Sequence, residues 1–298
     1  MAHPHTTAGP ARLEDALVVL FCSVDDAYRL LNPRACRYAS LKKLSDSEVL
    51  TLALLQQLRG VESERSFLRE AARFFSHLFP GVAGLHPSSS FHRRVRKLGR
   101  FLEPLRRAVV GELAGDPETL LVDPTLLPVL HPRQVGQSAA GFGGAAWARW
   151  GPFSAYGVKL HLLCSTNRVP VSYELTPANA ADVRLVEELS AEARLGDAVA
   201  RRLFGDLAYR SKKLEGALAE RGVKLAAERT QRRPEIRQQV EVCFATLKRA
   251  FGLGGTTLAK TPVGLATRIA AKVAAYTYGP YVNRLFGRPW GRIEELWA

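Results

Sequence analysis

The chain has 298 residues, and its 42 lysines and arginines against 28 aspartates and glutamates give a formal net charge of +14. With 47% hydrophobic and 23% charged residues it can bury a core, which excludes wholesale disorder. No uncharged apolar run reaches about 18 residues, so a transmembrane span is excluded. Residues 1–10 lack the features of a secretory signal. The basic excess predicts a polyanionic partner, usually nucleic acid; the alternative is a basic surface kept for solubility.

Cysteine usage fits the same class of protein. The four cysteines are far apart and lack the close spacing of a zinc site or a disulfide framework, so we expect a reducing cytoplasm and no membrane partner.

Residues 11–115 carry the apolar spacing of helices, and we predict an all-helical region. Ser45 and Glu48 form a capping box at the start of one helix. Basic residues are concentrated between Phe91 and Ala108, on the side opposite an apolar stripe; they are Arg93, Arg94, Arg96, Lys97, Arg100, Arg106 and Arg107. Such a helix is typical of a DNA-binding helix-turn-helix, and equally of a solvated face on an ordinary bundle.

The hydrophobic period changes after Gly115-Asp116-Pro117. Residues 119–122 predict a buried strand that ends at Asp123-Pro124, and residues 131–151 predict a long loop. Two strands at 157–165 and 168–176 form a hairpin, after which helices and strands alternate. We therefore predict a mixed sheet of the α/β class, with the element order of the ribonuclease H-like fold.

Three acidic residues stand apart from the acids of helix surfaces. Asp123 and Asp206 each directly follow a short apolar strand, where an unpaired carboxylate is costly; for each alone, a cap or turn aspartate is the alternative. Glu241 lies at the rim of the buried face of a helix predicted at 234–251. Arg237 and Lys248 share its stripe, and a surface ion pair between Arg237 and Glu241 is the alternative there.

Other residues could contact nucleic acid near these acids. Lys159 and His161 share one strand face, and either DNA contact or an exposed edge strand would explain them. Trp147 and Trp150 could stack on an unpaired base, although anchoring the loop to the core is the favoured role.

Taken together, these residues resemble the DDE transposases of bacterial insertion sequences. In that family Arg, three residues, Glu, six residues and Lys form a signature, which Arg237, Glu241 and Lys248 satisfy. Three further segments look like family motifs: Leu-Leu-Val-Asp123, Phe-Gly-Asp206-Leu-Ala-Tyr209 and Tyr156-Gly-Val-Lys-Leu-His161.

The helical part looks most like one branch of that family. Its segments Leu44-Ser-Asp-Ser-Glu48 and Phe91-His-Arg-Arg94 resemble the insertion sequence 982 group, which is related to the insertion sequence 4 and 5 superfamily. The resemblance covers about residues 12–285. It departs from the pattern at Pro234, where related families have a tyrosine seven residues before the glutamate.

The resemblance implies a transposase with a helical DNA-binding region at 11–115 and a ribonuclease H-like catalytic domain at 116–290. Asp123, Asp206 and Glu241 are the implied catalytic residues and ligands of two Mg²⁺ ions, for which Mn²⁺ can substitute. Asp123 would bridge both ions. The implied reaction hydrolyses DNA at the transposon ends, and the freed 3′-hydroxyls then attack target DNA.

The implied partner is double-stranded DNA, as terminal repeats and as target, held by a homodimer or a larger assembly associated with the bacterial nucleoid. The residues expected to contact DNA are Arg237, Lys248, Lys159, His161, Arg93, Arg94, Arg96 and Lys97. Two alternatives remain: a catalytically inactive DNA-binding descendant of a transposase, and a ribonuclease H-like nuclease without strand transfer.

Overall fold

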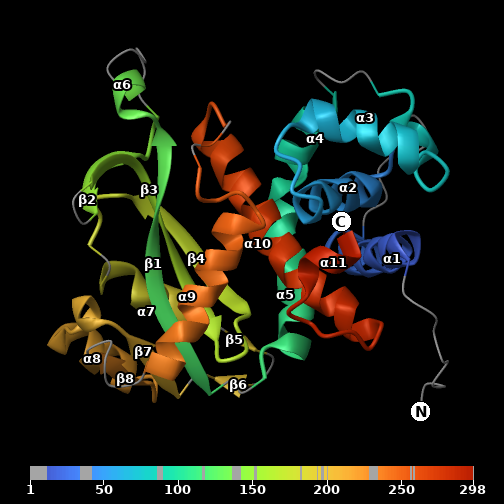
Figure 1. Cartoon of the computed structure of the whole chain (residues 1–298). Helices are drawn as coiled ribbons and strands as arrows, with labels where there is room; N and C mark the ends of the chain where they lie inside the picture. Colours follow the sequence, from blue (N-terminus) through green and yellow to red (C-terminus); the bar gives the residue numbers. More distant parts are fainter. Residues whose placement is uncertain are drawn as a thin grey trace, which may run out of the picture. The chain divides into compact units, whose positions relative to one another are not determined.

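The chain divides into two compact units, drawn in Figure 1: Met1–Arg106 with Ala270–Ala298, and Arg107–Ile269. The computed structural model describes residues 12–33, 42–85, 90–115, 118–135, 142–150, 153–181, 183–192, 194–195, 198–199, 201–227, 234–255, 257 and 259–297. None of the described helices is long and apolar enough to cross a membrane. The assignment of DNA binding to residues 11–115 and catalysis to residues 116–290 stays a prediction.

The first unit is helical, as predicted. Its elements are α1 (Leu13–Leu31), α2 (Asp46–Leu58), α3 (Glu64–Phe74), η2 (Pro80–Val82), α4 (Ser90–Leu98), η3 (Gly99–Phe101), and α11 (Ile293–Trp297). Two helices run from one unit into the other: α5 (Leu102–Leu113) and α10 (Pro262–Leu285). The capping box at the start of α2 is confirmed, because the Ser45 side chain accepts from the Glu48 backbone and the Glu48 carboxylate accepts from the Ser45 backbone.

The C-terminal residues complete the core of this unit. The Tyr278 hydroxyl on α10 donates to the Leu105 carbonyl oxygen at 3.1 Å, and burial raises the pKa of that hydroxyl. Trp297 on α11 is fully buried, and its carbonyl oxygen accepts from Arg59. Contacts across so many residues leave no local pattern in the sequence, so this pairing of the two ends of the chain was not predicted.

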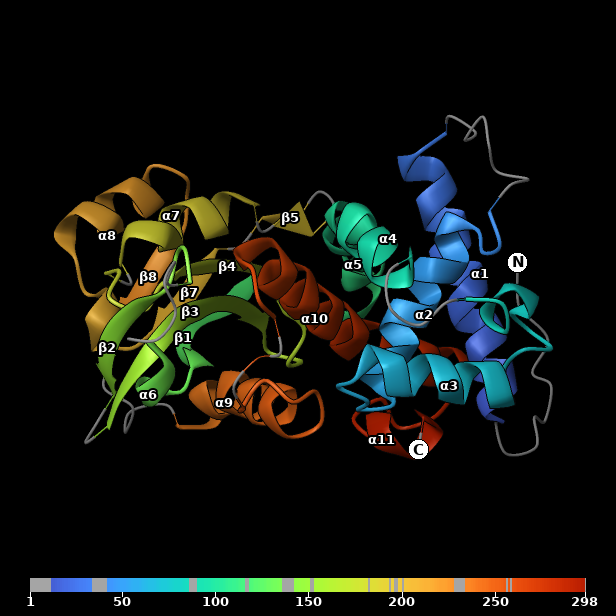
Figure 2. The same ribbon diagram turned by 90° about the horizontal axis from the view of Figure 1, so that it is seen from above.

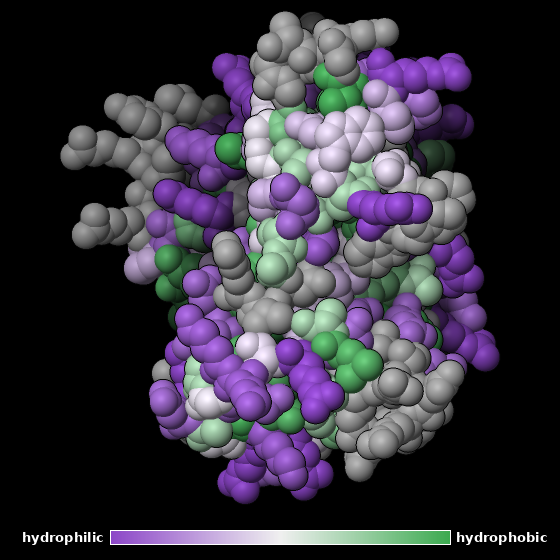
Figure 3. Space-filling view, turned by 90° about the vertical axis from the view of Figure 1, so that its left-hand side faces the viewer, coloured by the Kyte–Doolittle hydropathy of each residue, from purple (hydrophilic) through white to green (hydrophobic). Residues whose placement is uncertain are grey.

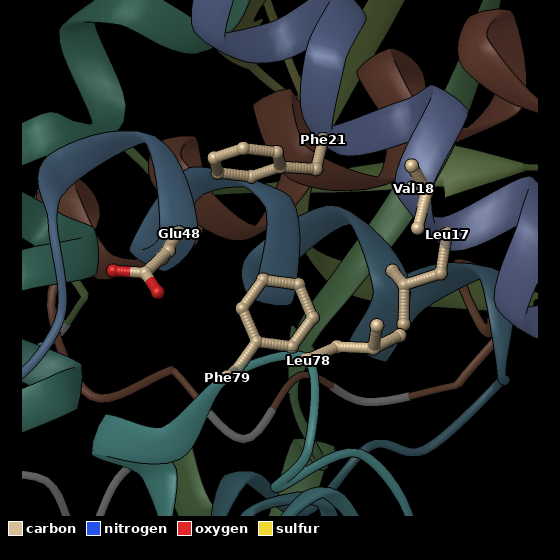
Figure 4. Close-up of a pocket in the computed structure, with 6 residues that line it drawn as sticks. All are labelled: Leu17, Val18, Phe21, Glu48, Leu78 and Phe79. Carbon is tan, nitrogen blue, oxygen red and sulfur yellow. The ribbon is translucent and has the colours of Figure 1, made fainter.

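An apolar pocket lies between α1, α2 and the segment after α3 (Figure 4). Its lining is formed by Leu17, Val18, Phe21, Glu48, Leu78 and Phe79. Of these, Glu48 is the only charged residue, and it is already engaged in the capping box of α2.

The basic segment after Phe91 is not one continuous helix. Helix α4 ends at Leu98, the 3₁₀ turn η3 follows, and α5 begins at Leu102. Gly99 lies at this break, and glycine is a poor helix former, which explains why an apolar stripe of helical period did not produce an unbroken helix.

The second unit holds a six-stranded mixed sheet. Its strands are β1 (Thr119–Leu130), β2 (Ala146–Trp150), β3 (Phe153–Ser165), β4 (Pro170–Pro177), β7 (Arg202–Gly205) and β8 (Lys224–Ala227). The remaining elements are α6 (Pro132–Val135), α7 (Val183–Glu192), the small hairpin of β5 (Arg194–Leu195) and β6 (Ala198–Val199), η4 (Leu207–Tyr209), α8 (Lys212–Ala219) and α9 (Pro234–Arg249).

The strand directions confirm the predicted mixed α/β class and the ribonuclease H-like order of elements. β3 pairs antiparallel with β1 on one side and with β2 and β4 on the other. β7 pairs parallel with β1, and β8 pairs parallel with β7. Figure 2 shows α7 and α8 on one side of this sheet and α9 on the other.

Two predictions along this part of the chain are wrong. The first strand does not end at Asp123 but continues to Leu130, with Pro124 inside it. Pairing with β7 covers only residues 119–121, and proline is tolerated where a strand edge needs no donor. The predicted loop at 131–151 contains the short helix α6 and the strand β2, which pairs with β3. The alanines and tryptophans of β2 show no clear alternation of apolar and polar residues, so this segment carries no strand signal in its sequence.

Candidate active site

The register of the sheet aligns the two predicted aspartates. Leu121 on β1 pairs with Phe204 on β7, and continuing this parallel register by two residues brings Asp123 level with Asp206. The close approach of Val122 to Gly205 supports the extension, because a Cβ added at Gly205 would lie 3.1 Å from Val122 Cγ1. Residues paired in register point to the same side of a sheet, so Asp123 and Asp206 belong to one face.

Asp206 directly follows β7 and caps η4. Its Oδ1 accepts from the Ala208 backbone at 2.9 Å, which realises the alternative of a capping aspartate. A carboxylate has two oxygens, and Asp206 is only half-buried. The cap is therefore compatible with a second role for the same side chain.

Helix α9 covers the face that carries Asp123. On β1 and β3, Asp123 pairs with Leu162 and Leu121 with Cys164, so these four residues share one face. Cys164 and Cys243 are both fully buried, and the Cys164 thiol, whose pKa burial raises, interacts with the Cys243 side chain of α9. This contact fixes α9 on the Asp123 face.

The next turns of α9 bring a cation to Asp123. Burial lowers the pKa of the Lys248 ammonium, and the Asp123 carboxylate opposes that shift by raising it. The two charges are therefore close enough to interact, although Lys248 keeps much of its side chain in solvent. Lys248, the last residue of the family signature, is thus within electrostatic range of the first of the predicted catalytic acids.

Glu241 lies on the same stripe of α9 as Lys248, two turns earlier. The buried side of the helix is formed by Val240, Cys243, Phe244 and Leu247, of which the periodicity predicted all but Cys243. The helix ends at Arg249, so the predicted Phe251 is buried but lies beyond it. Glu241 itself is exposed at the rim of that side. Arg237 is on the same helix, but its side chain lies outside the part of the chain that the structure describes.

The donor set is that of a hard divalent cation, since Mg²⁺ prefers carboxylate oxygens. In the described residues, no three histidine, cysteine, aspartate or glutamate side chains lie close enough together to hold a metal ion as they stand. Asp123, Asp206 and Glu241 thus fit such an ion by chemistry and by face, and their gathering around it remains a prediction.

Lys159 and His161 lie on the other face of the sheet. His161 pairs with Pro124 and Lys159 with Leu126, which alternate with Asp123 along β1. His161 is fully buried, and its Nε2 is hydrogen-bonded to Thr176 Oγ1 at 2.8 Å, while Lys159 donates to the Ala180 carbonyl. β3 is also an inner strand, so the edge-strand alternative is wrong. Burial argues against the predicted DNA contact of His161, whose role here is structural.

The tryptophans of β2 differ from the favoured interpretation. The Trp147 ring contacts the Tyr156 ring edge-on, with centroids 5.7 Å apart, yet 47% of Trp147 remains exposed. It therefore does not anchor the segment by burial. The side chain of Trp150 lies outside the described residues.

The face seen in Figure 3 is mostly hydrophilic, with small scattered hydrophobic areas.

The four basic residues predicted on α4 do not share one environment. Arg93 and Lys97 are exposed and Arg96 is partly exposed. Arg94 turns inward, where its guanidinium donates to the Leu44 carbonyl at 2.8 Å and to Asp46 at 2.6 Å. Arg106, further along, is fully buried in an ion pair with Glu103. Arg106 is therefore part of the helical core, and Arg94 is partly buried and engaged within the helical unit.

Comparison with known proteins identifies the family of the second unit. The family described as Transposase DDE domain matches residues 114–278, which is more than half of the chain. No curated protein sequence matches the chain significantly.

Two solved transposase structures are similar to the chain over most of its length. The piggyBac transposase synaptic complex with hairpin DNA has 10% sequence identity and a TM-score of 0.46, over 97% of this chain and 79% of that one. The Mos1 strand transfer complex has 12% identity and a TM-score of 0.34, over 97% of this chain and 98% of that one.

Proposed function

Because the chain belongs to the transposase DDE domain family, we propose that it is an enzyme that cuts the ends of an insertion sequence and joins the freed 3′-hydroxyls to target DNA. One observation carries the proposal: Asp123 and Asp206 are level on one face of the sheet, and α9 brings Lys248 next to Asp123 over that face. This arrangement supports a site on the sheet face of Asp123 and Asp206, which is covered by α9, the helix of Glu241.

Each side chain of the proposed site has a separate task. Asp123, Asp206 and Glu241 would hold two Mg²⁺ ions, which when bound supply Lewis acidity and an activated oxygen nucleophile for phosphoryl transfer. Lys248 carries positive charge beside Asp123 and would hold a DNA phosphate next to the reacting one. Arg237, one turn before Glu241 in the sequence, completes the signature and would hold another DNA phosphate.

The remaining details are proposals of the same kind. The branch would be the insertion sequence 982 group, and the DNA partners the terminal repeats and the target. Two ends must be cut and joined together, so the working form would be a homodimer or a larger assembly. The place of action would be the cytoplasm, on the bacterial nucleoid.

The test is a cleavage and joining assay in Mg²⁺ with DNA that carries the element's own ends. The variants Asp123→Asn, Asp206→Asn and Glu241→Gln keep size and remove one charge each. We expect each to lower the rate about a thousandfold or more, because metal stabilisation of the transition state is worth several kcal/mol and each 1.36 kcal/mol is tenfold.

Glu188→Gln is the matched control, an exposed acid on α7, which covers the other face of the sheet. It should cleave and join like the wild type. Cleavage without joined products would favour a nuclease, and DNA binding without cleavage in the wild type would favour an inactive descendant. Full activity in Asp123→Asn would overturn the assignment of the site.

A further inference from the structure

Helix α4 has a packed side and a basic side. Phe91 and Leu98, two turns apart, are buried and define the packed side. By helical periodicity, Arg93, Arg96 and Lys97 lie on the opposite side, and Arg94 lies next to the packed one. The exposed Arg100 follows in η3. We call Arg93, Arg96, Lys97 and Arg100 the α4 basic face.

Asp46, the first residue of α2, forms an ion pair with Arg94 in the middle of α4. Its carboxylate accepts from Arg94 at 2.6 Å and from Lys42 at 2.9 Å. The Tyr28 hydroxyl of α1 donates to the same carboxylate at 3.2 Å. Asp46 therefore joins α1 and α2 to α4 through one partly buried charge cluster.

Tyr28 also holds the end of the segment. Its ring packs edge-on against Phe101 of η3, with centroids 5.0 Å apart. The Arg100 guanidinium lies over the Phe101 ring, 4.9 Å from its centroid. The same pair of residues, Asp46 and Tyr28, thus supports both Arg94 inside α4 and the turn that carries Arg100.

We propose that Asp46 and Tyr28 are positioning residues: they hold the α4 basic face, whose contact with DNA was already expected from the sequence, in the orientation in which it binds the backbone of double-stranded DNA. The inference rests on the proposed function, which makes DNA the partner of this chain. A helix that is fixed by contacts on its packed side loses less conformational entropy on binding than a mobile segment. A fixed orientation of its basic side chains therefore raises the affinity for DNA.

The sign of one substitution separates positioning from net charge. Asp46→Asn removes a negative charge, so charge alone would tighten binding to DNA. Loss of the anchor has the opposite effect. We expect about tenfold weaker binding of a short double-stranded oligonucleotide at about 0.1 M salt, and a log–log salt dependence shallower by about 0.9 for each phosphate that the protein no longer neutralises.

Glu70→Gln is the matched control in the same unit. It breaks the ion pair between Arg59 and Glu70, whose side chains are 22% and 21% exposed, respectively. In the Arg94–Asp46 pair the corresponding values are 23% and 17%, so the two pairs are similarly buried. It changes net charge equally and leaves a guanidinium without its carboxylate. We expect unchanged or slightly tighter binding and an unchanged salt slope. Tyr28→Phe, which loses only the hydroxyl, provides a milder change should Asp46→Asn fold poorly, with an effect between wild type and Asp46→Asn.

The outcomes are separable when the full chain is used throughout. Weaker binding and a shallower slope in Asp46→Asn alone, with Tyr28→Phe in between, support the proposal. Equal weakening in Glu70→Gln would indicate general destabilisation and overturn it, as would wild-type binding in Asp46→Asn. A wild type that does not bind DNA would instead overturn the proposed function, and this inference with it.

Discussion

Lys248 is the cation of α9 for which we propose a phosphate contact, and its ammonium is partly desolvated. Partial burial of the ammonium disfavours its charged form and lowers its pKa. The Asp123 carboxylate raises the pKa again, but only in part. Because much of the side chain stays in solvent, this effect on stability is small. A lysine at this position is compatible with the proposed phosphate contact.

Lys248→Met should therefore separate function from stability. Because the pKa of the ammonium is lowered in the folded protein, its charge opposes folding below that pKa. The penalty disappears as pH rises towards the unfolded value. We expect the melting temperature at neutral pH to be unchanged or slightly raised, while DNA cleavage falls by about tenfold or more. Thermal unfolding measured beside the cleavage assay checks this, and a large loss of stability would contradict the account.

Asp46 gives the opposite dependence on pH. Burial alone would raise the pKa of its carboxyl group, but hydrogen bonds from Lys42 and Arg94 lower it below the ordinary value. A lowered folded pKa stabilises the protein above the unfolded pKa, and this contribution is lost as pH falls through the folded one.

Acid unfolding should report this difference directly. As pH decreases from about 5 to about 2, the free energy of unfolding should decrease more steeply in the wild type than in Asp46→Asn. Urea titrations at several pH values would measure both slopes. Parallel slopes would mean that the Asp46 carboxylate has no net stabilising partner in solution.

Among the elements, the pairing of β1 with β3 is what positions Asp123. These two strands pair from Leu120 to Leu130, with one irregularity near Pro128, and β3 passes Gly157 close to β1. A Cβ at Gly157 would lie 2.2 Å from the Leu127 carbonyl oxygen, a contact with backbone that cannot move aside. The glycine of the Tyr156-Gly-Val motif is therefore required by the close approach of the two strands.

Gly157→Ala should destabilise the second unit by about 1–3 kcal/mol or more, because the strands must separate locally. Gly216→Ala on α8 is the contrasting change, since a Cβ there meets nothing within 4 Å. It should stabilise the helix by about 0.5–1 kcal/mol. Chemical denaturation of both variants measures the difference, and equal effects would contradict the assigned packing of β3 against β1.

Local patterns predict the elements better than their ends. The capping box at Ser45, the hairpin of β3 and β4 and most of the buried side of α9 depend on neighbouring residues and follow from sequence. The start of the second hairpin strand was predicted too early, because Arg168 lies in the turn with a φ of 64° and β4 begins at Pro170. The extension of β1 beyond Asp123 depends on its pairing with β3, which no local pattern encodes. A proline inside a strand that is paired fully on only one side therefore looks like the end of that strand.

The candidate site is predictable to the same extent. Strand position and helical spacing single out Asp123, Asp206 and Glu241 as candidates because these signals are local, and their shared role stays a prediction. Which face of β3 meets α9 depends on register, so Lys159 and His161 were expected near the acids although they lie on the other face. The roles of Tyr28 and Asp46 involve three helices, and their only local signal is an acid in the first turn of α2.

In the whole molecule, each of the two units carries one of the two proposed DNA-contacting surfaces. The second unit holds the proposed site, with cations along α9, and the first holds the α4 basic face. The helices α5 and α10 connect them, and the C-terminal helices belong to the core of the first unit. Removal of residues beyond 285 should therefore damage the helical unit rather than the sheet, because Trp297 is buried there.

Asp123 on β1, Asp206 at the end of β7 and Glu241 on α9 are proposed to hold divalent cations on one face of the sheet. A crystal structure with DNA and Mn²⁺, in which anomalous scattering locates the ions, tests this proposal. We predict Mn²⁺ bound by Asp123, Asp206 and Glu241 on the α9 side. Mn²⁺ bound on the His161 side, or bound by other residues with Glu241 left out, would contradict the account.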